Sequence, residues 1–166
     1  MSMMSKIITA EKLAGRLNKA RKSGRKIVFT NGCFDLLHVG HVRYLAAAAS
    51  EGDLLVVGLN SDESVRLIKG AKRPIVPQDH RAEVLASIAC VDYIVLFDEA
   101  DPLTLIQTLC PDILAKGADW TEEKIVGAEF VKSNGGKIVR IALVADASTS
   151  RIIERILEKY GRVGSF

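Results

Sequence analysis

Two of the three histidines of the chain, His38 and His41, lie three residues apart, and Gly40 precedes the second. Residues at positions i and i+3 share one face of a helix. If a helix begins near Val39, both imidazoles face one site, and Gly40 leaves the backbone open to a ligand. Unpaired N–H groups and the positive dipole end of a helix start attract anions. The motif therefore favours a phosphate site, with zinc binding and plain helix capping as alternatives.

The zinc alternative lacks its usual partners in the sequence. The HExxH motif uses i, i+4 spacing with a glutamate, which is absent here. A catalytic zinc ion commonly has three protein ligands, and nothing in the sequence places His80, the third histidine, beside the pair. We therefore predict no protein-held metal at His38 and His41.

A second anion-binding element lies at the start of the last predicted helix, where Ser148, Thr149 and Ser150 follow one another. Hydroxyls and free N–H groups cluster at such a position, although plain N-capping needs only one of the three side chains. The chain has neither GxGxxG nor GxxxxGK[ST], the two common glycine loops for nucleotides. Two anion-ready helix starts in one domain fit a polyphosphate better than either does alone.

The elements that must position these residues alternate between strand and helix. Apolar runs predict strands at 26–32, 53–60, 92–97, 112–117 and 137–144. Helical periodicity predicts helices at 9–24, 41–52, 62–69, 78–90, 101–109, 122–136 and 148–161. We expect Gly52 to end the helix at 41–52 and Asn60 with Glu63 to form a capping box.

This alternation predicts an α/β fold, a doubly wound Rossmann-like domain with a five-stranded parallel sheet and helices on both faces. In such folds ligands bind at the carboxyl ends of the strands, where strand order reverses. The loop after the first strand, which carries His38, is the expected place. We predict an N-terminal helical extension at 1–25 and a single domain at 26–166.

Bulk composition excludes several protein classes. The net charge of +3 over 166 residues, without interleaved basic and aromatic residues, gives no sign of nucleic-acid binding. No apolar run reaches the length of a signal peptide or a membrane span. Cys33, Cys90 and Cys110 are odd in number and widely spaced, so free thiols in a reducing cytoplasm are expected.

Taken in order, the motifs resemble the nucleotidyltransferase superfamily marked by HxGH and a C-terminal ISTS-like motif, here HVGH (38–41) and ASTS (147–150). GCFDLLHVGHVRYL, GLNSDESVRLIKGAKRPI, DHRAEVLASIACVDYIVLF, PDILAKGADW and NGGKIV together resemble its heptose 1-phosphate adenylyltransferase branch. That branch is familiar as the C-terminal half of a bifunctional kinase/adenylyltransferase. The resemblance implies AMP transfer from ATP to D-glycero-D-manno-heptose 1-phosphate, giving ADP-heptose and pyrophosphate for the lipopolysaccharide core. Mg²⁺ would be carried by the ATP triphosphate, with few protein ligands.

The resemblance also implies roles for individual residues of this chain. His38, His41 and Lys72 would be catalytic, and Asp35, Lys69 and Arg73 would bind the sugar phosphate. Nucleotide and phosphate binding would fall to Asn31, Gly32, Cys33, Phe34, Gly40, Arg81, Lys116, Gly117, Asp119, Ser148, Thr149 and Ser150. Several of these have a simpler structural reading. The basic loop at 69–73 could be solvated, Arg81 could pair with Glu83 or Asp79, Asp35 could cap a turn, and Trp120 could be core or stack on the base.

One departure separates this chain from the related glycerol-phosphate cytidylyltransferases, which carry an arginine in RTEGIST shortly before the Ser/Thr cluster. The corresponding segment of this chain, LVADASTS, has no arginine. This difference weakens the hypothesis that the chain uses CTP. A cytidylyltransferase for glycerol 3-phosphate or a similar alcohol, a non-catalytic nucleotide sensor and a zinc-dependent hydrolase stay open as alternatives. The expected partners are ATP and a sugar 1-phosphate, with a homodimer in the cytoplasm. Because only about 25 residues precede the first strand, we expect a separate kinase and phosphatase to supply the sugar 1-phosphate.

Overall fold

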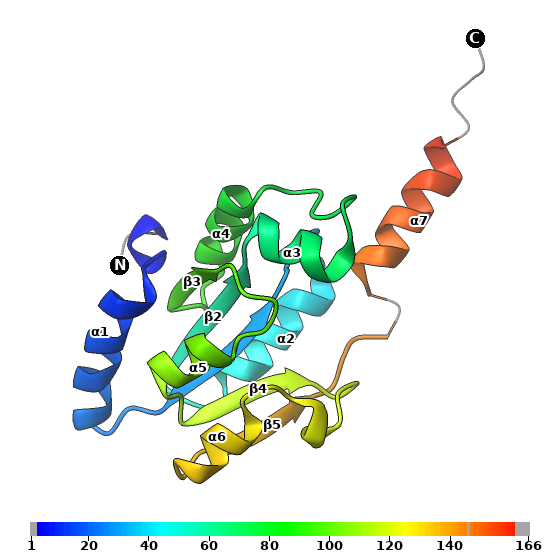
Figure 1. Ribbon diagram of the computed structural model, residues 1–166. Helices are drawn as coiled ribbons and strands as arrows, with labels where there is room; N and C mark the ends of the chain where they lie inside the picture. Colours follow the sequence, from blue (N-terminus) through cyan, green and yellow to red (C-terminus); the bar gives the residue numbers. More distant parts are fainter. Residues whose placement is uncertain (1–2, 146, 162–166) are drawn as a thin grey trace.

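The computed structural model describes residues 3–145 and 147–161. The outer ends of the predicted extension and of the predicted domain, at 1–2 and 162–166, lie outside these residues. Five parallel strands form one sheet in the order β3-β2-β1-β4-β5 (Figure 1). Their bounds are Ile27–Gly32 (β1), Leu54–Asn60 (β2), Tyr93–Phe97 (β3), Ile113–Gly117 (β4) and Lys137–Ile141 (β5). The predicted doubly wound Rossmann-like fold is confirmed.

The strand order reverses between β1 and β4, and the register at this point opens the sheet. β1 pairs with β2 along its whole length, from Ile27 with Leu54 to Gly32 with Leu59. Its pairing with β4 is limited to Val28 with Ile113 and Phe29 with Leu114. The carboxyl ends of β1 and β4 therefore separate, and a crevice forms where ligands bind in folds of this kind.

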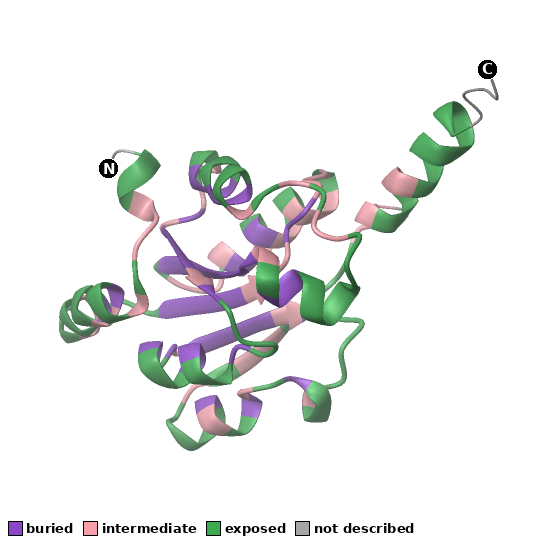
Figure 2. Cartoon of the chain, turned by 45° about the horizontal axis from the view of Figure 1, so that its top comes forward, coloured by how far each residue is buried: buried purple, intermediate pink, exposed green. Residues whose placement is uncertain are grey.

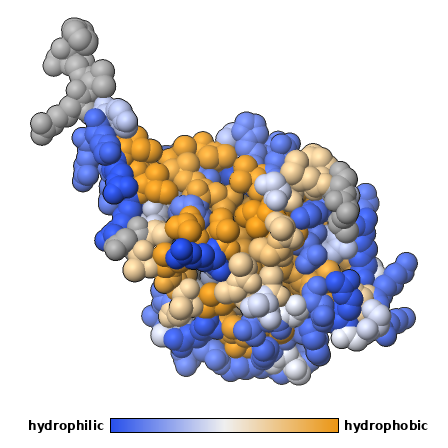
Figure 3. All heavy atoms as spheres, turned by 180° about the vertical axis from the view of Figure 1, so that it is seen from behind, coloured by the Kyte–Doolittle hydropathy of each residue, from blue (hydrophilic) through white to orange (hydrophobic). Residues whose placement is uncertain are grey.

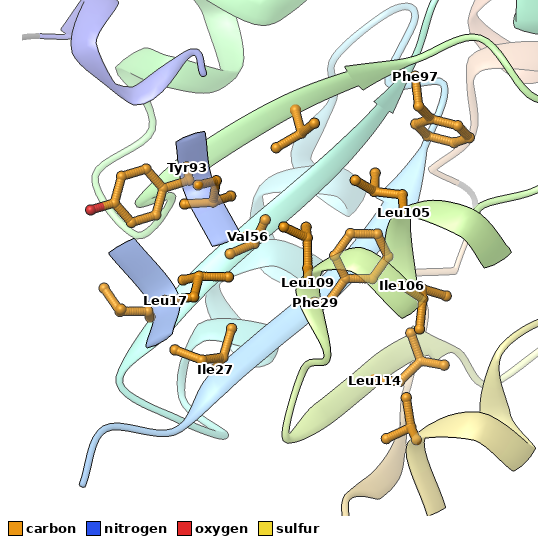
Figure 4. Close-up of a cluster of buried hydrophobic side chains, with 14 of the residues drawn as sticks. Leu17, Ile27, Phe29, Val56, Tyr93, Phe97, Leu105, Ile106, Leu109 and Leu114 are labelled. Carbon is orange, nitrogen blue, oxygen red and sulfur yellow. The ribbon is translucent and has the colours of Figure 1, made fainter. Parts of the chain in front are cut away.

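Helices cover both faces of the sheet, and alternate strand residues supply the two cores. On one face, α1 (Ala10–Lys22), α5 (Leu103–Leu109) and α6 (Ala128–Ser133) pack over a core that contains Ile27 and Phe29 of β1 (Figure 4). On the other, α2 (Val39–Ala49) and α4 (Gln78–Ser87) pack over Val28, the residue between those two. The strands β1, β2, β3 and β4 are the most buried part of the molecule (Figure 2), as expected for a parallel sheet covered on both faces.

The N-terminal segment belongs to the packed body of the domain. Leu13 and Leu17 of α1 are fully buried in the same core as Phe29. After the short 3₁₀ helix η1 (Met3–Lys6), Ile7 forms a parallel bridge with Ile94, beside the outer edge of β3. This segment therefore shields a strand edge that would otherwise present free backbone groups.

Two helices have a special place relative to the sheet. The first, α3 (Asp62–Lys69), follows β2 and ends at the rim of the crevice. The second, α7 (Thr149–Tyr160), has no buried residues and projects away from the body of the domain (Figure 1). Seen from behind (Figure 3), a broad apolar area lies next to α7. None of the described helices is long and apolar enough to cross a bilayer.

The predicted helix at 122–136 is wrong as a single element. The structure has a 3₁₀ helix, η2 (Glu122–Lys124), and then α6, which begins at Ala128. Gly127 lies between them with φ 85, in the left-handed region that interrupts a right-handed helix. The break turns η2 toward the crevice, so this correction affects the site.

Two further details of the helix ends differ from the sequence prediction. The N-cap of α3 is Ser61, whose hydroxyl accepts the N–H of Ser64, and not Asn60. α2 ends at Ala49, before the expected glycine cap at Gly52. A Cβ at Gly52 would lie 2.9 Å from the carbonyl oxygen of Lys26, so this glycine serves a close backbone approach.

Candidate active site

A cleft opens at the separated ends of β1 and β4, and it has two adjoining lobes. The first lobe has a volume of about 680 Å³ and the second of about 510 Å³. Both share a floor made by Asn31, Gly32, Cys33, Phe34, His41, Lys69, Lys116, Trp120 and Thr149. The remaining wall of the first lobe contains His38, Gly40, Tyr44, Gly117, Asp119, Leu143, Val144, Ala147, Ser148 and Arg151. Most of the residues predicted from sequence thus lie in one cleft.

The two histidines of the HVGH motif stack on each other at the start of α2. Their ring centroids are 3.9 Å apart with an interplanar angle of 25°. His38 is the N-cap of α2, and its Nδ1 accepts the N–H of Gly40 at 3.1 Å. Phe34 lies against the other side of His41, with ring centroids 5.3 Å apart. Capping and ligand exposure therefore coexist, because capping occupies only one ring nitrogen of His38.

Burial keeps both imidazoles neutral at neutral pH. It lowers the pKa of His41 to about 4, with a further contribution from the adjacent His38. Burial also lowers the pKa of His38. Among the described residues, Nδ1 of His41 is buried without a hydrogen-bond partner. A neutral imidazole keeps one N–H donor, so each ring can donate a hydrogen bond to an anionic oxygen.

Gly40 is required by the contact between the two helix starts. A Cβ at this position would lie 2.9 Å from Nδ1 of His38 and 3.2 Å from the Cβ of Ala147. The hydroxyl of Thr149 donates to the carbonyl oxygen of Leu36 at 3.3 Å, which ties the start of α7 to the loop before α2. The two anion-ready helix starts, far apart in sequence, thus meet at one lobe.

The start of α7 has the local structure that the sequence predicts. Ser148 is its N-cap, and the hydroxyl accepts the N–H of Arg151 at 3.2 Å. Thr149 lines both lobes, whereas Ser150 lines the second lobe only. Ser148, whose hydroxyl caps α7, and Thr149 together form the hydroxyl-bearing surface of the first lobe.

Lys116, at the end of β4, supplies a buried cation on the shared floor. Its Nζ donates to Oδ1 of Asn31 at 2.5 Å and lies 5.8 Å from the ring centroid of Trp120. Burial lowers the pKa of Lys116 to about 8, although the nearby Asp119 and Cys33 act in the opposite direction. An incompletely solvated cation of this kind interacts strongly with an arriving anion.

Asp35, which was expected to face the substrate, lines the second lobe, and its carboxylate is bonded to protein groups. The carboxylate is 4% exposed and accepts the backbone N–H groups of Ile75 and Val76. It also accepts Nε of Arg73 at 2.5 Å. Burial alone would raise the pKa of Asp35, but these three donors together lower it. Asp35 therefore anchors the loop at 73–76, and its ion pair restrains Arg73 at the second lobe.

The expectation that Arg81 contacts the nucleotide is corrected, because the structure gives this residue a structural role. Its side chain is fully buried and lines neither lobe. The guanidinium donates to the carbonyl oxygens of Cys33, Asn60 and Val76 and to the carboxylate of Asp62. Four hydrogen bonds to protein acceptors join the ends of β1, β2 and the loop before α4, so Arg81 holds the floor of the cleft in place.

The basic loop places a different lysine at the cleft from the one favoured by the sequence. Lys69, the last residue of α3, lines both lobes. Lys72 is exposed and lines neither lobe. Gly70, with φ 89, ends the helix, and Arg73 is the next residue along this loop that lines the cleft. The predicted catalytic place of Lys72 is therefore not seen in this structure, and Lys69 is the better placed cation.

Sequence reasoning missed several residues of the cleft. Leu143, Val144 and Ala147 add an apolar wall to the first lobe, and Arg151 adds a cation beside the start of α7. Tyr44 also lines this lobe, and its hydroxyl is 2.7 Å from that of Thr30. An arginine three residues after a capping serine was a usable signal for Arg151. The others have no local signature, since only the fold brings them to the cleft.

The second lobe combines Asp35, Arg73 and Ser150, which the sequence analysis selected, with residues that it did not select. Its own walls are formed by Asp35, Asn60, Ile68, Arg73, Ala100, Asp101, Pro102, Lys124, Ile125, Val126 and Ser150. Among the described residues no group of three or more His, Cys, Asp or Glu side chains is arranged to hold a metal ion. His80 is exposed on α4 and lines neither lobe, so it adds no third ligand to the histidine pair.

A parallel sheet with a switch-point cleft, and two helix starts that meet at this cleft, define a Rossmann-like domain with a candidate ligand site. A match to the cytidylyltransferase-like family model over residues 29–155 agrees with this geometry. The chain belongs to the cytidylyltransferase-like family and is a nucleotidyltransferase.

Curated relatives give the same assignment. The chain is 55% identical over 156 residues to the bifunctional protein HldE of Syntrophotalea carbinolica, covering 94% of this chain and 32% of that protein. It is 53% identical over 157 residues to the bifunctional protein HldE of Geobacter sulfurreducens, covering 95% of this chain and 32% of that protein. The chain thus spans about a third of the length of these relatives.

Solved structures share the fold. A lipopolysaccharide core biosynthesis protein from Thermoplasma volcanium matches with a TM-score of 0.59 and 29% identity, covering 73% of this chain and 98% of that chain. A pantoate-beta-alanine ligase from Francisella tularensis matches with a TM-score of 0.58 and 18% identity, covering 92% of this chain and 78% of that chain. The second likeness shows the fold alone.

Proposed function

We propose that this domain transfers AMP from ATP to D-glycero-D-manno-heptose 1-phosphate, giving ADP-heptose and pyrophosphate for the lipopolysaccharide core. The observation that carries the proposal is the meeting of the stacked His38 and His41 with the start of α7 at one cleft. The high identity to HldE proteins and the likeness to a lipopolysaccharide core biosynthesis protein support the heptose pathway as its setting.

In the proposed reaction, a phosphate oxygen of the sugar 1-phosphate forms a bond to the α-phosphorus of ATP. The bond between the α-phosphorus and its bridging oxygen to the β-phosphate breaks, and pyrophosphate leaves. A phosphate monoester with a second pKa of about 6 is mostly dianionic at pH 7, so no general base is required. Catalysis then depends on positioning the two substrates and on stabilising charge in the transition state.

The residues of the first lobe suit the triphosphate. Neutral N–H groups of His38 and His41 would donate to phosphate oxygens, and Lys116 on the shared floor would stabilise the charge at the reacting phosphorus. The hydroxyls and free N–H groups at the start of α7, with Arg151, would bind the β- and γ-phosphates. Mg²⁺ would neutralise part of the triphosphate charge, coordinated mainly by phosphate oxygens and water.

The base is proposed to stack on Trp120 beside the apolar wall formed by Leu143 and Val144. Trp120 lines both lobes and is 46% exposed, which leaves its ring available to a flat ligand. Stacking by itself accepts any base, so a cytidylyltransferase acting on glycerol 3-phosphate is the nearest rival. Arg151, which lines the same lobe, would supply positive charge near the Ser/Thr cluster for either nucleotide.

A panel of nucleotides against phosphorylated acceptors tests the proposal by pyrophosphate release. ATP with heptose 1-phosphate should be the best pair. Release with CTP and glycerol 3-phosphate but not with ATP and heptose 1-phosphate would overturn it. Nucleotide binding without release for any pair would indicate a sensor. Loss of activity to a zinc chelator in excess Mg²⁺ would indicate a zinc enzyme.

We further propose that the domain forms a homodimer through the apolar side of α7. Ile156, Leu157 and Tyr160 are exposed on this helix, and an isolated helix of this length is marginally stable in water. Sedimentation equilibrium should give twice the chain mass. Replacement of Leu157 by Glu should shift the protein toward monomer, and a wild-type monomer at micromolar concentration would contradict the proposal.

A further inference from the structure

The two lobes of the cleft have different walls. The walls found only in the first lobe combine an apolar surface at Leu143 and Val144 with the start of α7. Those found only in the second lobe include the polar side chains of Asn60, Asp101 and Lys124 beside apolar residues such as Ile125 and Val126. His41, Lys69 and Lys116 lie on the shared floor, so a reacting phosphate at the junction would meet all three.

We infer that the second lobe binds the polyhydroxyl part of the acceptor and that Asp101 and Lys124 determine its specificity. The inference rests on the proposed function and assigns it a sugar subsite. With the acceptor phosphate at the junction, the rest of the acceptor must extend away from the nucleotide. The second lobe is the adjoining space, and its volume of about 510 Å³ lies in the range of small-molecule sites.

Asp101 is held in place and keeps an acceptor atom for a ligand. Its Oδ1 accepts the N–H of Leu103 at 2.9 Å, which restrains the side chain at the start of α5. Among the described residues, the structure records no partner for Oδ2 of Asp101. Sugar hydroxyls donate well to carboxylate oxygens because such hydrogen bonds are charge-assisted. A restrained carboxylate therefore fits a hydroxyl-bearing acceptor better than a purely anionic one.

Lys124 and the two glutamates before it in η2 line different pockets. Glu122 and Glu123 line a different pocket, on the side of α6, and Glu122 pairs with Lys132. Lys124, the next residue, lines the second lobe and has no ion pair among the described residues. The short helix thus divides its charged residues between two pockets, with the two glutamates on the side of α6 and Lys124 at the second lobe. An ammonium group offers three donors to hydroxyl or phosphate oxygens.

Substitutions that keep shape test this assignment. In Asp101→Asn the amide oxygen still accepts the N–H of Leu103, so the local fold is retained while the charge is lost. Lys124→Gln removes the ammonium group from η2, an element separate from the start of α5, which provides a second variant. The matched controls are Asp98→Asn and Glu123→Gln, because both residues are exposed and line other pockets. Circular dichroism verifies folding of each protein.

Steady-state kinetics should show a split between the two substrates. Asp101→Asn and Lys124→Gln should each raise the KM for sugar 1-phosphate by about 10-fold or more, as loss of a charge-assisted hydrogen bond does. The KM for ATP, and the Kd of a non-hydrolysable ATP analogue by calorimetry, should stay within about 2-fold of wild type. The two controls should leave all these constants unchanged.

Acceptor choice gives an independent readout. Glycerol 3-phosphate is too short to reach far into the lobe, so the ratio of kcat/KM for sugar 1-phosphate over glycerol 3-phosphate should fall about 10-fold in Asp101→Asn. An active wild type whose sugar KM is unchanged in both variants would overturn the sugar subsite alone. A wild type that releases no pyrophosphate with any sugar 1-phosphate would overturn the proposed function itself.

Discussion

The imidazole rings of His38 and His41 stack at 3.9 Å, and the ring of His41 is the more deeply buried of the two. The pair forms because His38 caps α2 while His41 lies in its first turn. Stacking places both rings on the side of the cleft that faces the start of α7. The geometry thus offers two neutral donors to one polyphosphate, in positions that depend on a single helix start.

His41 should contribute mainly to the chemical step. His41→Ala is expected to lower kcat by about 10² or more, the usual effect of losing one preorganised donor to a developing charge. The fold should survive, because the residue lies at a helix start. Val42→Ala, on the exposed side of the same turn, serves as the control. An unchanged kcat in a folded His41→Ala protein would reduce the pair to a capping role.

The low pKa of His41 predicts a loss of stability in acid. The folded-state pKa is about 4, against 6.5 for the ordinary side chain, so the unfolded chain takes up a proton first as the pH falls. The contribution of neutral His41 to the free energy of unfolding is therefore complete above pH 6.5 and is lost progressively toward pH 4. Between about pH 7.5 and about pH 5, the free energy of unfolding measured in urea should fall more for wild type than for His41→Asn. Equal decreases in both proteins would show that another group causes the pH dependence.

Lys69 should matter more than Lys72 for catalysis. Both lysines are exposed, but Lys69 lines both lobes and Lys72 lines neither. Lys69→Gln is expected to lower kcat/KM for both substrates by about 10-fold, as loss of one charged phosphate contact does. Lys72→Gln should change it by less than about 3-fold. The reverse order would show that the loop rearranges when substrates bind.

Lys116 should set the alkaline limit of activity. Its pKa of about 8 means that the folded protein loses this positive charge as the pH rises through 8. Because kcat/KM reports groups of the free enzyme, it should decline above about pH 8. In Lys116→Arg the charge persists, and the decline should move to higher pH even if the overall rate is lower. A pH profile identical in both proteins would assign the alkaline decline in kcat/KM to another group.

Gly40→Ala should damage both the site and the fold. The new Cβ would lie 2.9 Å from the His38 ring, so the ring or the helix start must move, at a cost of about 1–3 kcal/mol. We expect kcat to fall at least about 10-fold, since misplaced groups lose much of their catalytic effect. Gly15→Ala is the matched control, because a Cβ at this position of α1 would have no atom within 4 Å. It should instead stabilise the protein by about 0.5–1 kcal/mol.

The sequence by itself determined the sheet, the order of its elements and the two helix starts. Strand and helix periodicity are local properties, and alternation of the two leaves few right-handed topologies. Capping chemistry is also local, which is why the HVGH and ASTS segments were placed correctly at the starts of α2 and α7. The motifs then lie at the carboxyl ends of strands, where a doubly wound sheet binds its ligands.

Only the tertiary structure decided which polar side chains face the cleft. Asp35 and Arg81 have the residue types of ligand-binding groups, yet both are bonded to backbone groups of segments distant in sequence. The choice between Lys69 and Lys72 follows from the left-handed turn at Gly70, and the place of Lys124 from the turn at Gly127. A charged side chain binds the partners that its neighbours in space provide, and no local pattern records those neighbours.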